Sequence, residues 1–267
     1  MSDNFKKTLE ERKQIIKNVI VGSSLKNQIA YNPLNLYQKE ILCADQLTPL
    51  ECLDVILSKK TQHCIQNSLE PLESKCDFLN KIYVNKLDFF DPQFEVIRGK
   101  SCVLDFNDVS SRDDLINKAL SQLGLNADSQ KLSGICQTLE ELIMNAQVDA
   151  KKLSKKEVLA PSKLILSVSN QLIAISIIDF YGTLDCYKLL KHIQAAFTLG
   201  FDKAMSKNSI GAGLGSALVY EHCDSLIMGV IPNEVTRVTV ILPLAVSEKK
   251  KQFIQKSIHI ITVNEKG

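Results

Sequence analysis

Residues 163–179 read KLILSVSNQLIAISIID, two apolar runs separated by the short polar segment SNQ. The β-branched residues isoleucine and valine recur in both runs and are enriched in strands, whereas serine and asparagine favour turns. Two such runs around a short polar connection predict an antiparallel β-hairpin. The second run ends at Asp179, so the hairpin also places a carboxylate at the end of an apolar strand.

Helical patterns lie on both sides of this hairpin. Before it, residues 110–124 begin with serines suited to capping a helix and end near Gly124, and residues 131–150 form a longer amphipathic pattern. After it come an irregular helical segment, a glycine-rich helix leading to a strand, a further strand, and a basic tail ending in a predicted edge strand: residues 186–210, 213–230, 236–244 and 247–267. Residues 94–106 predict a strand pair or one bulged strand. Together these patterns predict an α+β domain over residues 91–267.

The first 90 residues show a different pattern. Short apolar runs, the first at residues 15–22, alternate three times with helical patterns, which predicts a small α/β unit with parallel strands. Its second helix has Thr48 as a cap, Pro49 at the first helical position and Glu51 at the third. The unit over residues 1–90 is either a degenerate receiver-like module, since its third apolar run offers no phosphoacceptor aspartate, or an unrelated α/β cap.

The composition limits the classes of partner. The chain has 267 residues, of which 45% are hydrophobic, and its 32 basic and 30 acidic side chains give a formal charge of +2. This balance provides no electrostatic footprint for nucleic acid or an anionic membrane. The eight cysteines form no CxxC pair, which favours buried thiols in a reducing cytosol. No stretch suits a membrane span or signal peptide, so we expect a soluble, cytoplasmic protein.

The segment NSIGAGLGSALVY (208–220) places glycine at alternate positions in front of an apolar helical pattern. It lacks the lysine and hydroxyl residue of a P-loop, and it is not preceded by a strand and followed by an acidic residue about 20 positions on, as a dinucleotide fold would require. A helix that starts at Leu214 or Gly215 would still offer unpaired N–H groups and a partial positive charge, and Gly211 and Gly213 would let the backbone approach an anion. The segment is therefore either a phosphate cradle or a hinge before a helix.

Two further sets of polar residues suit nucleotide chemistry. Glu141, Asn145 and Asp149 follow at helical spacing and form one polar stripe. A carboxylate above an amide oxygen suits Mg²⁺ that bridges phosphates and the activation of a hydroxyl or water, although a solvated helix face has the same pattern. Asp179, beside Gly182, can accept a hydrogen bond from the exocyclic amine of adenine, or can form only a turn or helix cap.

These residues belong to three ordered motifs: ELIMNA (141–146), DFYGTL (179–184) and GAGLG (211–215). The intervals are 34 residues from Asn145 to Asp179 and 32 from Asp179 to Gly211. In this order they resemble the N-box and the two glycine boxes of the GHKL ATP-binding superfamily, which includes gyrase, histidine kinases and anti-sigma-factor serine kinases. The resemblance covers about residues 95–245. It implies a Bergerat-type two-layer α+β sandwich, with a mixed sheet covered by helices on one face, that binds ATP and Mg²⁺.

The resemblance also implies a role for each matching position. Asn145 would bind Mg²⁺, and Glu141 would be the general base or the residue that orients it. Asp179 would read the adenine amine, Gly182 would let the base lie close to the backbone, and Thr236 would lie near the adenine. The remaining nucleotide-binding positions would be Asp149 in the stripe, Gly211, Gly213, Leu214 and Gly215 around the phosphates, and Lys207 or Lys203 in the segment 186–210, which would form the ATP lid.

The departures from the family pattern leave two functions open. Anti-sigma kinases have NAxxHG where this chain has NAQVDA (145–150), and the first glycine box keeps only Gly182, between Tyr181 and Thr183. The retained Glu141 favours a protein serine/threonine kinase, whereas the altered boxes favour an ATP-dependent switch. A nucleotide-free scaffold is a further alternative. The implied partner is a protein: an anti-sigma antagonist, a sigma factor or a response-regulator-like protein, with a homodimer also open.

A rival interpretation rests on His63. The segment HCIQNSL (63–69) resembles the HxxxNxL box of one class of histidine kinases, in which the imidazole accepts the γ-phosphoryl group. Against this interpretation, Pro71 follows closely and only 78 residues separate His63 from Glu141. A dimerisation hairpin needs two long helices before the catalytic domain, so the sequence favours the other assignments.

Overall fold

The computed structural model of the chain describes residues 41–43, 47–66, 72–108, 110–127, 132–154, 157, 160–200, 211–244 and 256–263. The strands within these residues are β1 (Ile41–Cys43), β2 (His63–Ile65), β3 (Lys100–Phe106), β4 (Ser162–Val168), β5 (Leu172–Asp179), β6 (Ser225–Ile231), β7 (Val235–Pro243) and β8 (Ser257–Thr262). The helices are α4 (Pro49–Lys59), α5 (Leu72–Val84), the 3₁₀ helix η1 (Lys86–Phe90), α6 (Arg112–Gln122), α7 (Ser133–Met144), the π-helical turn η3 (Asn145–Asp149), α8 (Ala150–Leu153), α9 (Cys186–Leu199) and α11 (Gly211–His222). The first apolar run, at residues 15–22, lies outside the described residues.

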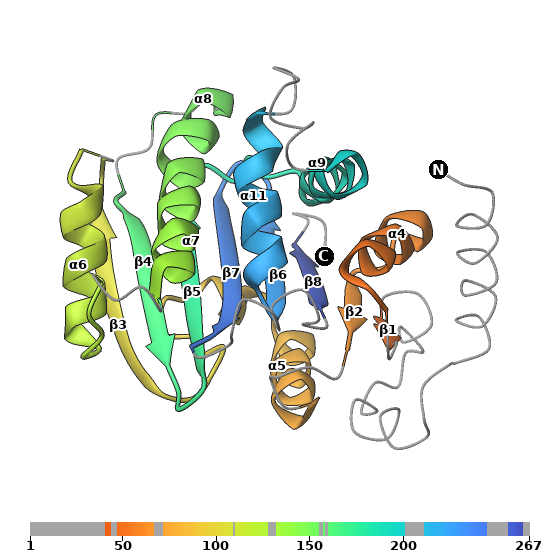
Figure 1. Cartoon of the computed structure of the whole chain (residues 1–267), viewed down its shortest axis with the longest axis horizontal. Helices are drawn as coiled ribbons and strands as arrows, with labels where there is room; N and C mark the ends of the chain where they lie inside the picture. Colours follow the sequence, from red (N-terminus) through yellow and green to blue (C-terminus); the bar gives the residue numbers. More distant parts are fainter. Residues whose placement is uncertain are drawn as a thin grey trace.

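The strands form one sheet in the order β1-β2-β8-β6-β7-β5-β4-β3. β1 pairs with β2 and β6 with β8 in parallel, and the remaining neighbours are antiparallel. Figure 1 shows this open sheet with helices packed against it. The expectation of an α+β fold with a mixed sheet is therefore confirmed, and the predicted hairpin is the antiparallel pair β4–β5.

The hairpin lies inside the sheet because its second strand is apolar on both sides. All eight residues of β5 are buried, with β4 on one edge and β7 on the other. Its one polar interior residue, Ser176, is satisfied by a 2.7 Å hydrogen bond with Thr239 across the β5–β7 pair. The strand ends at Asp179, which pairs in register with Thr236 on β7.

The larger helical layer covers one face of the sheet. α4, α6, α7, α9 and α11 contribute to a single apolar cluster with the strands beneath them. Leu139 and Ile143 of α7 belong to it together with Leu166 and Ile175 of the hairpin, and all four side chains are buried. Burial of this amphipathic helix fixes its polar stripe on the side away from the sheet.

The opposite face is also partly covered, unlike the expectation that helices pack on one face only. A second apolar cluster on this face joins α5 and η1 to the sheet through Phe78, Leu79, Ile82, Phe89, Ile227 and Ile241. Arg237 of β7 is 1% exposed, and its guanidinium donates to the carbonyls of Phe89, Asp91 and Phe94. These bonds hold the segment after α5 against the sheet. Burial lowers the pKa of Arg237 to about 10.

The amino-terminal part shows the predicted strand–helix–strand unit within its described residues. β1 and β2 are parallel and are connected through α4, and α4 begins with the predicted capping box between Thr48 and Glu51. β2 then pairs with β8. The sheet thus continues across residue 91, where the sequence places the boundary between two units.

β8 is an interior strand, so the prediction of an edge strand in the tail is wrong. It lies between β2 and β6, and five of its six residues are buried. Lys75 of α5 helps to fix it: its ammonium lies 3.3 Å from the Asp224 carboxylate and donates to Ser257 Oγ at 2.9 Å. A buried strand needs partners on both edges, and here they come from sequence positions about 30 and 190 residues away.

Two other expectations are refined. Residues 100–106 form one continuous strand, β3, rather than a strand pair or a bulged strand. The helix predicted over residues 110–124 is present as α6, with Ser111 before its first turn and Gly124 in the left-handed conformation after its end. The Ser111 side chain makes no capping hydrogen bond.

Candidate functional site

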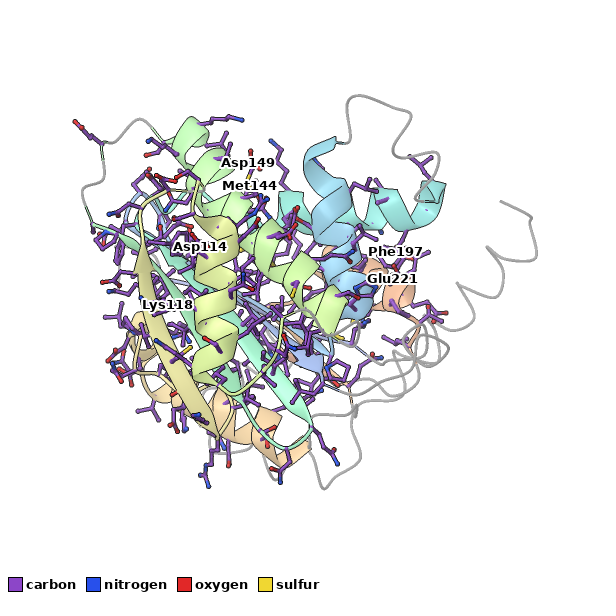
Figure 2. The ribbon with its side chains drawn as sticks, turned by 60° about the vertical axis from the view of Figure 1, so that its left-hand side comes forward. Asp114, Lys118, Met144, Asp149, Phe197 and Glu221 are labelled. Carbon is purple, nitrogen blue, oxygen red and sulfur yellow. The ribbon has the colours of Figure 1, made fainter. Side chains whose placement is uncertain are left out.

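The helix that carries the polar stripe changes its winding at Asn145. α7 ends at Met144, the next five residues form a π-helical turn, and α8 follows directly. Single π-turns inside helices occur frequently at functional sites. Glu141 and Asn145 stay within hydrogen-bonding distance of each other, whereas Asp149 lies toward the end of the helix and its side chain is 50% exposed beside Lys152 (Figure 2).

Glu141 and Asn145 meet a third residue, Ser216 on α11. Asn145 Nδ2 donates to Glu141 Oε1 at 3.2 Å and to Ser216 Oγ at 3.4 Å, and Ser216 Oγ donates to Glu141 Oε1 at 3.3 Å. The residues belong to helices whose side chains come together although 71 positions separate Asn145 from Ser216. The first and third motifs are therefore in contact.

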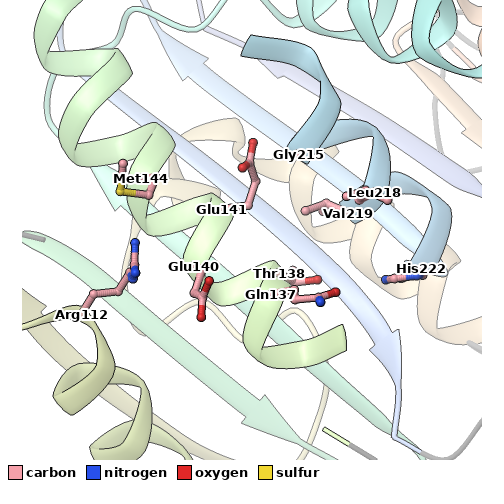
Figure 3. A pocket seen from close by; sticks show the side chains of 10 residues that line it. All are labelled: Arg112, Gln137, Thr138, Glu140, Glu141, Met144, Gly215, Leu218, Val219 and His222. Atoms are coloured by element: carbon pink, nitrogen blue, oxygen red, sulfur yellow. The ribbon is translucent and has the colours of Figure 1, made fainter. Parts of the chain in front are cut away.

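Gly215 makes this convergence sterically feasible. A Cβ at position 215 would overlap the carboxylate of Glu141, including Cδ and both oxygens. Figure 3 shows the Glu141 side chain in the space between α7 and α11, next to Gly215. The glycine thus serves close side-chain packing, in addition to any contact with a ligand.

The surroundings of Glu141 act on the pKa of its carboxyl in both directions. Burial raises the pKa of this carboxyl, the hydrogen bonds from Asn145 and Ser216 oppose the rise, and the charge of Asp149 adds to it. A carboxylate with a raised pKa accepts a proton more readily than an exposed one. Glu141 can therefore act chemically as a general base.

The glycine run differs from its predicted geometry. α11 begins at Gly211, so Gly211, Gly213 and Leu214 lie in its first turns, instead of in a loop before a helix at Leu214 or Gly215. The first four N–H groups of a helix have no partner within it. The amino end of α11 therefore carries a partial positive charge and N–H groups that have no partner within the helix.

A second polar group gathers at the end of β5. Asp179 is 5% exposed, and its Oδ1 accepts a hydrogen bond from Tyr181 N at 3.0 Å. Burial raises the pKa of Asp179 to about 6, against the effect of the N–H groups of Tyr181 and Gly182 and of the nearby Thr236 hydroxyl. Thr236 Oγ1 is buried and forms no hydrogen bond of ordinary geometry within the part of the chain that the structure describes.

Gly182 has a structural requirement of its own. Its φ of +60° is the left-handed region, and a Cβ there would lie 2.5 Å from Ile231 O and 2.7 Å from Asn233 N. Its carbonyl accepts a 3.0 Å hydrogen bond from Asn233 N. The turn after Asp179 is therefore packed against the β6–β7 turn, and this contact alone explains the glycine.

The polar group around Glu141 and the polar group around Asp179 are neighbours. The Thr183 hydroxyl makes a long, 3.5 Å hydrogen bond to the carbonyl of Ala150, which joins the turn after β5 to the end of the stripe helix. The positions in the segment 201–210, Lys203 and Lys207, lie outside the described residues. α9, the described part of the predicted lid, packs on α11 through the edge-to-face rings of Phe197 and Tyr220.

A cavity of about 320 Å³ opens beside Glu141 between α6, α7 and α11 (Figure 3). Its walls are Arg112, Gln137, Thr138, Glu140, Glu141, Met144, Gly215, Leu218, Val219 and His222. Asp179, Gly182 and Thr236 do not line it. The cavity extends from Glu141 toward the carboxyl end of α11, away from the glycine-rich first turn.

His63 is buried inside the sheet. It lies on β2, is 2% exposed, and its Nδ1 is 3.3 Å from Nδ1 of His259 on β8. Burial, and next the charge of Lys86, lowers its pKa to about 3. The ring therefore lies in the interior of the sheet, with almost no surface open to a phosphoryl donor.

Sequence reasoning missed Ser216. A polar residue directly after the glycine run, in a helix whose next residues are apolar, was the available signal. Within the described residues no cluster of three or more histidine, cysteine or acidic side chains could hold a metal ion, and no helix there is both long and apolar enough to cross a bilayer. No known protein family and no curated protein matches the sequence.

Proposed function

We propose that the protein is a cytoplasmic signalling regulator that binds ATP and Mg²⁺ on a Bergerat-type two-layer fold and acts as a serine/threonine protein kinase similar to the anti-sigma-factor kinases. The observation that carries this proposal is the contact of Glu141 and Asn145 on α7–η3 with Gly215 and Ser216 on α11. A motif resemblance in the sequence alone does not require such a contact.

The residues present fit the nucleotide and the metal. Asp179 and Thr236 offer buried polar atoms for the adenine edge. The Thr236 hydroxyl has no hydrogen-bond partner of ordinary geometry among the described residues. The N–H groups at the start of α11, from Gly211 to Leu214, have no partner within the helix and suit phosphate oxygens. Mg²⁺ prefers oxygen ligands and keeps several waters in nucleotide sites, so the Asn145 amide oxygen would be one ligand beside water and phosphate oxygens.

The proposed chemistry assigns separate tasks to the metal ion, to Glu141 and to Asn145. Bound Mg²⁺ would neutralise phosphate charge. Glu141 would accept the proton of an attacking hydroxyl, a task for which its buried position and raised pKa suit it. The cavity beside Glu141 provides room for a hydroxyl-bearing segment of a partner protein. Asn145, held by hydrogen bonds to Glu141 and Ser216, would orient the metal.

An ATP-dependent switch with little turnover is the second candidate. It is favoured by Asp149, which stands where the anti-sigma kinases have histidine and points to solvent beside Lys152. In this function nucleotide binding would change a surface for a protein partner or a second copy of the chain. Glu141 would then have only a structural role.

Turnover of labelled ATP with Mg²⁺ separates the two candidates. The kinase assignment predicts that Glu141→Gln lowers ADP formation about 100-fold while the affinity for a non-hydrolysable ATP analogue stays within about two-fold. If the wild type and Glu141→Gln form ADP equally and near background, and both still bind the analogue, the switch would be established instead. Candidate antagonist proteins in the same assay identify the acceptor by transfer of label.

A further inference from the structure

The side-chain amide of Asn145 has two chemically different ends, and the structure directs one of them. Nδ2 donates both of its hydrogen bonds inward, to Glu141 Oε1 and to Ser216 Oγ. No described residue donates a hydrogen bond to Oδ1 of Asn145. The amide therefore has its donor end committed to the protein and its acceptor end left for a ligand.

The reverse orientation is electrostatically unfavourable. A carboxylate only accepts hydrogen bonds, so rotation of the amide by 180° would set Oδ1 against Glu141 Oε1. Ser216 strengthens this preference because its hydroxyl proton is directed to the same Glu141 oxygen, at 3.3 Å, which leaves only a lone pair to face Asn145. Two acceptors thus face the same end of the amide.

Ser216 is well placed for this task. It is 7% exposed in the second turn of α11, and its hydroxyl makes hydrogen bonds only to Glu141 and Asn145 within the described residues. The neighbouring residue, Gly215, gives the Glu141 carboxylate the space to approach. An apolar residue at position 216 would preserve the helix but remove one of the two acceptors.

We propose that Ser216 is a positioning residue that, together with Glu141, fixes the amide of Asn145 with its oxygen toward the metal ion. This inference rests on the proposed function, since it assumes a nucleotide-bound Mg²⁺. Hard divalent cations bind amide oxygen and not amide nitrogen, so only one orientation of Asn145 can serve as a ligand. Ser216 acts through Asn145 and touches neither metal nor nucleotide.

Calorimetric titration with a non-hydrolysable ATP analogue, with and without Mg²⁺, measures the effect directly. Ser216→Ala should reduce the Mg²⁺-dependent gain in affinity about 10-fold and change the metal-free affinity less than about two-fold, because one hydrogen bond in the network is lost. Ser216→Thr keeps the hydroxyl and should retain most of the gain. Ser121→Ala, whose hydroxyl contacts only the Lys118 carbonyl of its own helix, is the matched control and should bind like the wild type.

A double variant shows whether Ser216 acts through Asn145. In an Asn145→Ala background the Ser216→Ala change should have no further effect on the Mg²⁺-dependent gain. An unchanged gain in Ser216→Ala alone, or equal losses from Ser216→Ala in the two backgrounds, would overturn the assignment.

The orientation of the amide can be tested without nucleotide. In ¹H–¹⁵N spectra of the free protein, the Asn145 side-chain amide should give two well-separated protons protected from exchange, and Ser216→Ala should shift and deprotect them. Asn145→Ala provides the assignment. Unchanged Asn145 signals in Ser216→Ala overturn the positioning role even if nucleotide binds. Altered signals in a protein that binds no nucleotide confirm the hydrogen-bond network and refute the proposed function, and with it the metal.

Discussion

The carboxylate of Glu141 lies in the space where a side chain at position 215 would begin. This contact joins the polar stripe of α7 to the glycine run of α11, and it makes the spacing of the two helices depend on one glycine. The consequence is that Glu141 and the first turns of α11 cannot move independently. The contact is also open to a direct stability test.

Gly215→Ala should keep the fold but displace the Glu141 carboxylate. Alanine in a helix interior normally stabilises by about 0.5–1 kcal/mol relative to glycine. Here the overlap with Glu141 should cancel or reverse that gain, because the carboxylate must leave Asn145 and Ser216. Urea unfolding measures the change.

The control for this prediction is the same substitution in a Glu141→Ala background, where no carboxylate obstructs the new methyl group. Gly215→Ala should then stabilise normally, which gives a coupling of about 1 kcal/mol between the two positions. Equal effects of Gly215→Ala in both backgrounds would show that the two residues do not touch.

Asp179 should make the protein less stable as the pH rises from about 4 to about 6. Its pKa in the folded chain is about 6, above the ordinary value of 3.8, so the folded state holds the proton in a range where the unfolded state has lost it. The added stability is complete below pH 4 and is lost by about pH 6, with a total change of about 3 kcal/mol. Asp179→Asn should remove this slope and be the more stable protein at pH 8.

The measurement is urea unfolding of both proteins at several pH values, expressed as the difference between them. The asparagine can still accept the hydrogen bond from Tyr181 N, so packing of the turn is preserved. A difference that is constant from pH 4 to pH 8 would show that Asp179 titrates normally in the folded chain.

The buried pair His63 and His259 should give a pH dependence of the opposite sign. Burial lowers the pKa of both rings, to about 3 for His63, so the folded state keeps them neutral while the unfolded chain takes up protons below pH 6.5. The contribution of the neutral histidines to the unfolding free energy is fully present above pH 6.5. It should fall as the pH decreases, by about 2 kcal/mol at pH 5 for His63 alone.

Replacement of both histidines by leucine should flatten this acid limb of the unfolding curve, whatever its effect on absolute stability. The relevant quantity is the slope of the unfolding free energy between pH 7 and pH 5. The same slope in the double variant and the wild type would mean that the imidazoles are not held neutral at the β2–β8 pair.

The ion pair of Lys75 and Asp224 should be costly to break from one side. Both side chains are buried, at 1% and 0% exposure, so Lys75→Met or Asp224→Asn would leave a partner charge without its counter-ion. Each single change should cost about 3–5 kcal/mol, and the double variant should cost less than the sum. Additive losses in thermal unfolding would argue against direct pairing.

The sequence predicted elements whose signals are local. The hairpin over residues 163–179, the helix over residues 131–150 and the capping box at Thr48 each depend on neighbouring residues, and all three are present in the structure. The contact between the first and third motifs was not predicted from the sequence and is seen only in the structure. Binding of ATP and Mg²⁺ stays a prediction.

Features that depend on distant residues were not predictable. The segment 257–262 follows a polar stretch and looks like an edge strand, yet its partners on β2 and β6 make it interior. Arg237 lies in an apolar strand, and its burial is explained by three carbonyls of the segment after α5 together with the Ser176 hydroxyl. The hydrogen bonds of Ser216 with Glu141 and Asn145 exist only because α7 and α11 pack together.

The central claim is that Asn145 and its neighbours bind Mg²⁺-ATP. Its most direct test is calorimetric titration of the wild type and of Asn145→Ala with a non-hydrolysable ATP analogue, with and without Mg²⁺, and with a GTP analogue as the control. Binding by the wild type should be adenine-selective and strengthened by Mg²⁺, and Asn145→Ala should lose this binding while its unfolding transition is unchanged. No binding by the wild type, or equal Mg²⁺-dependent binding by the two proteins, would contradict it and favour a nucleotide-free scaffold or another metal ligand.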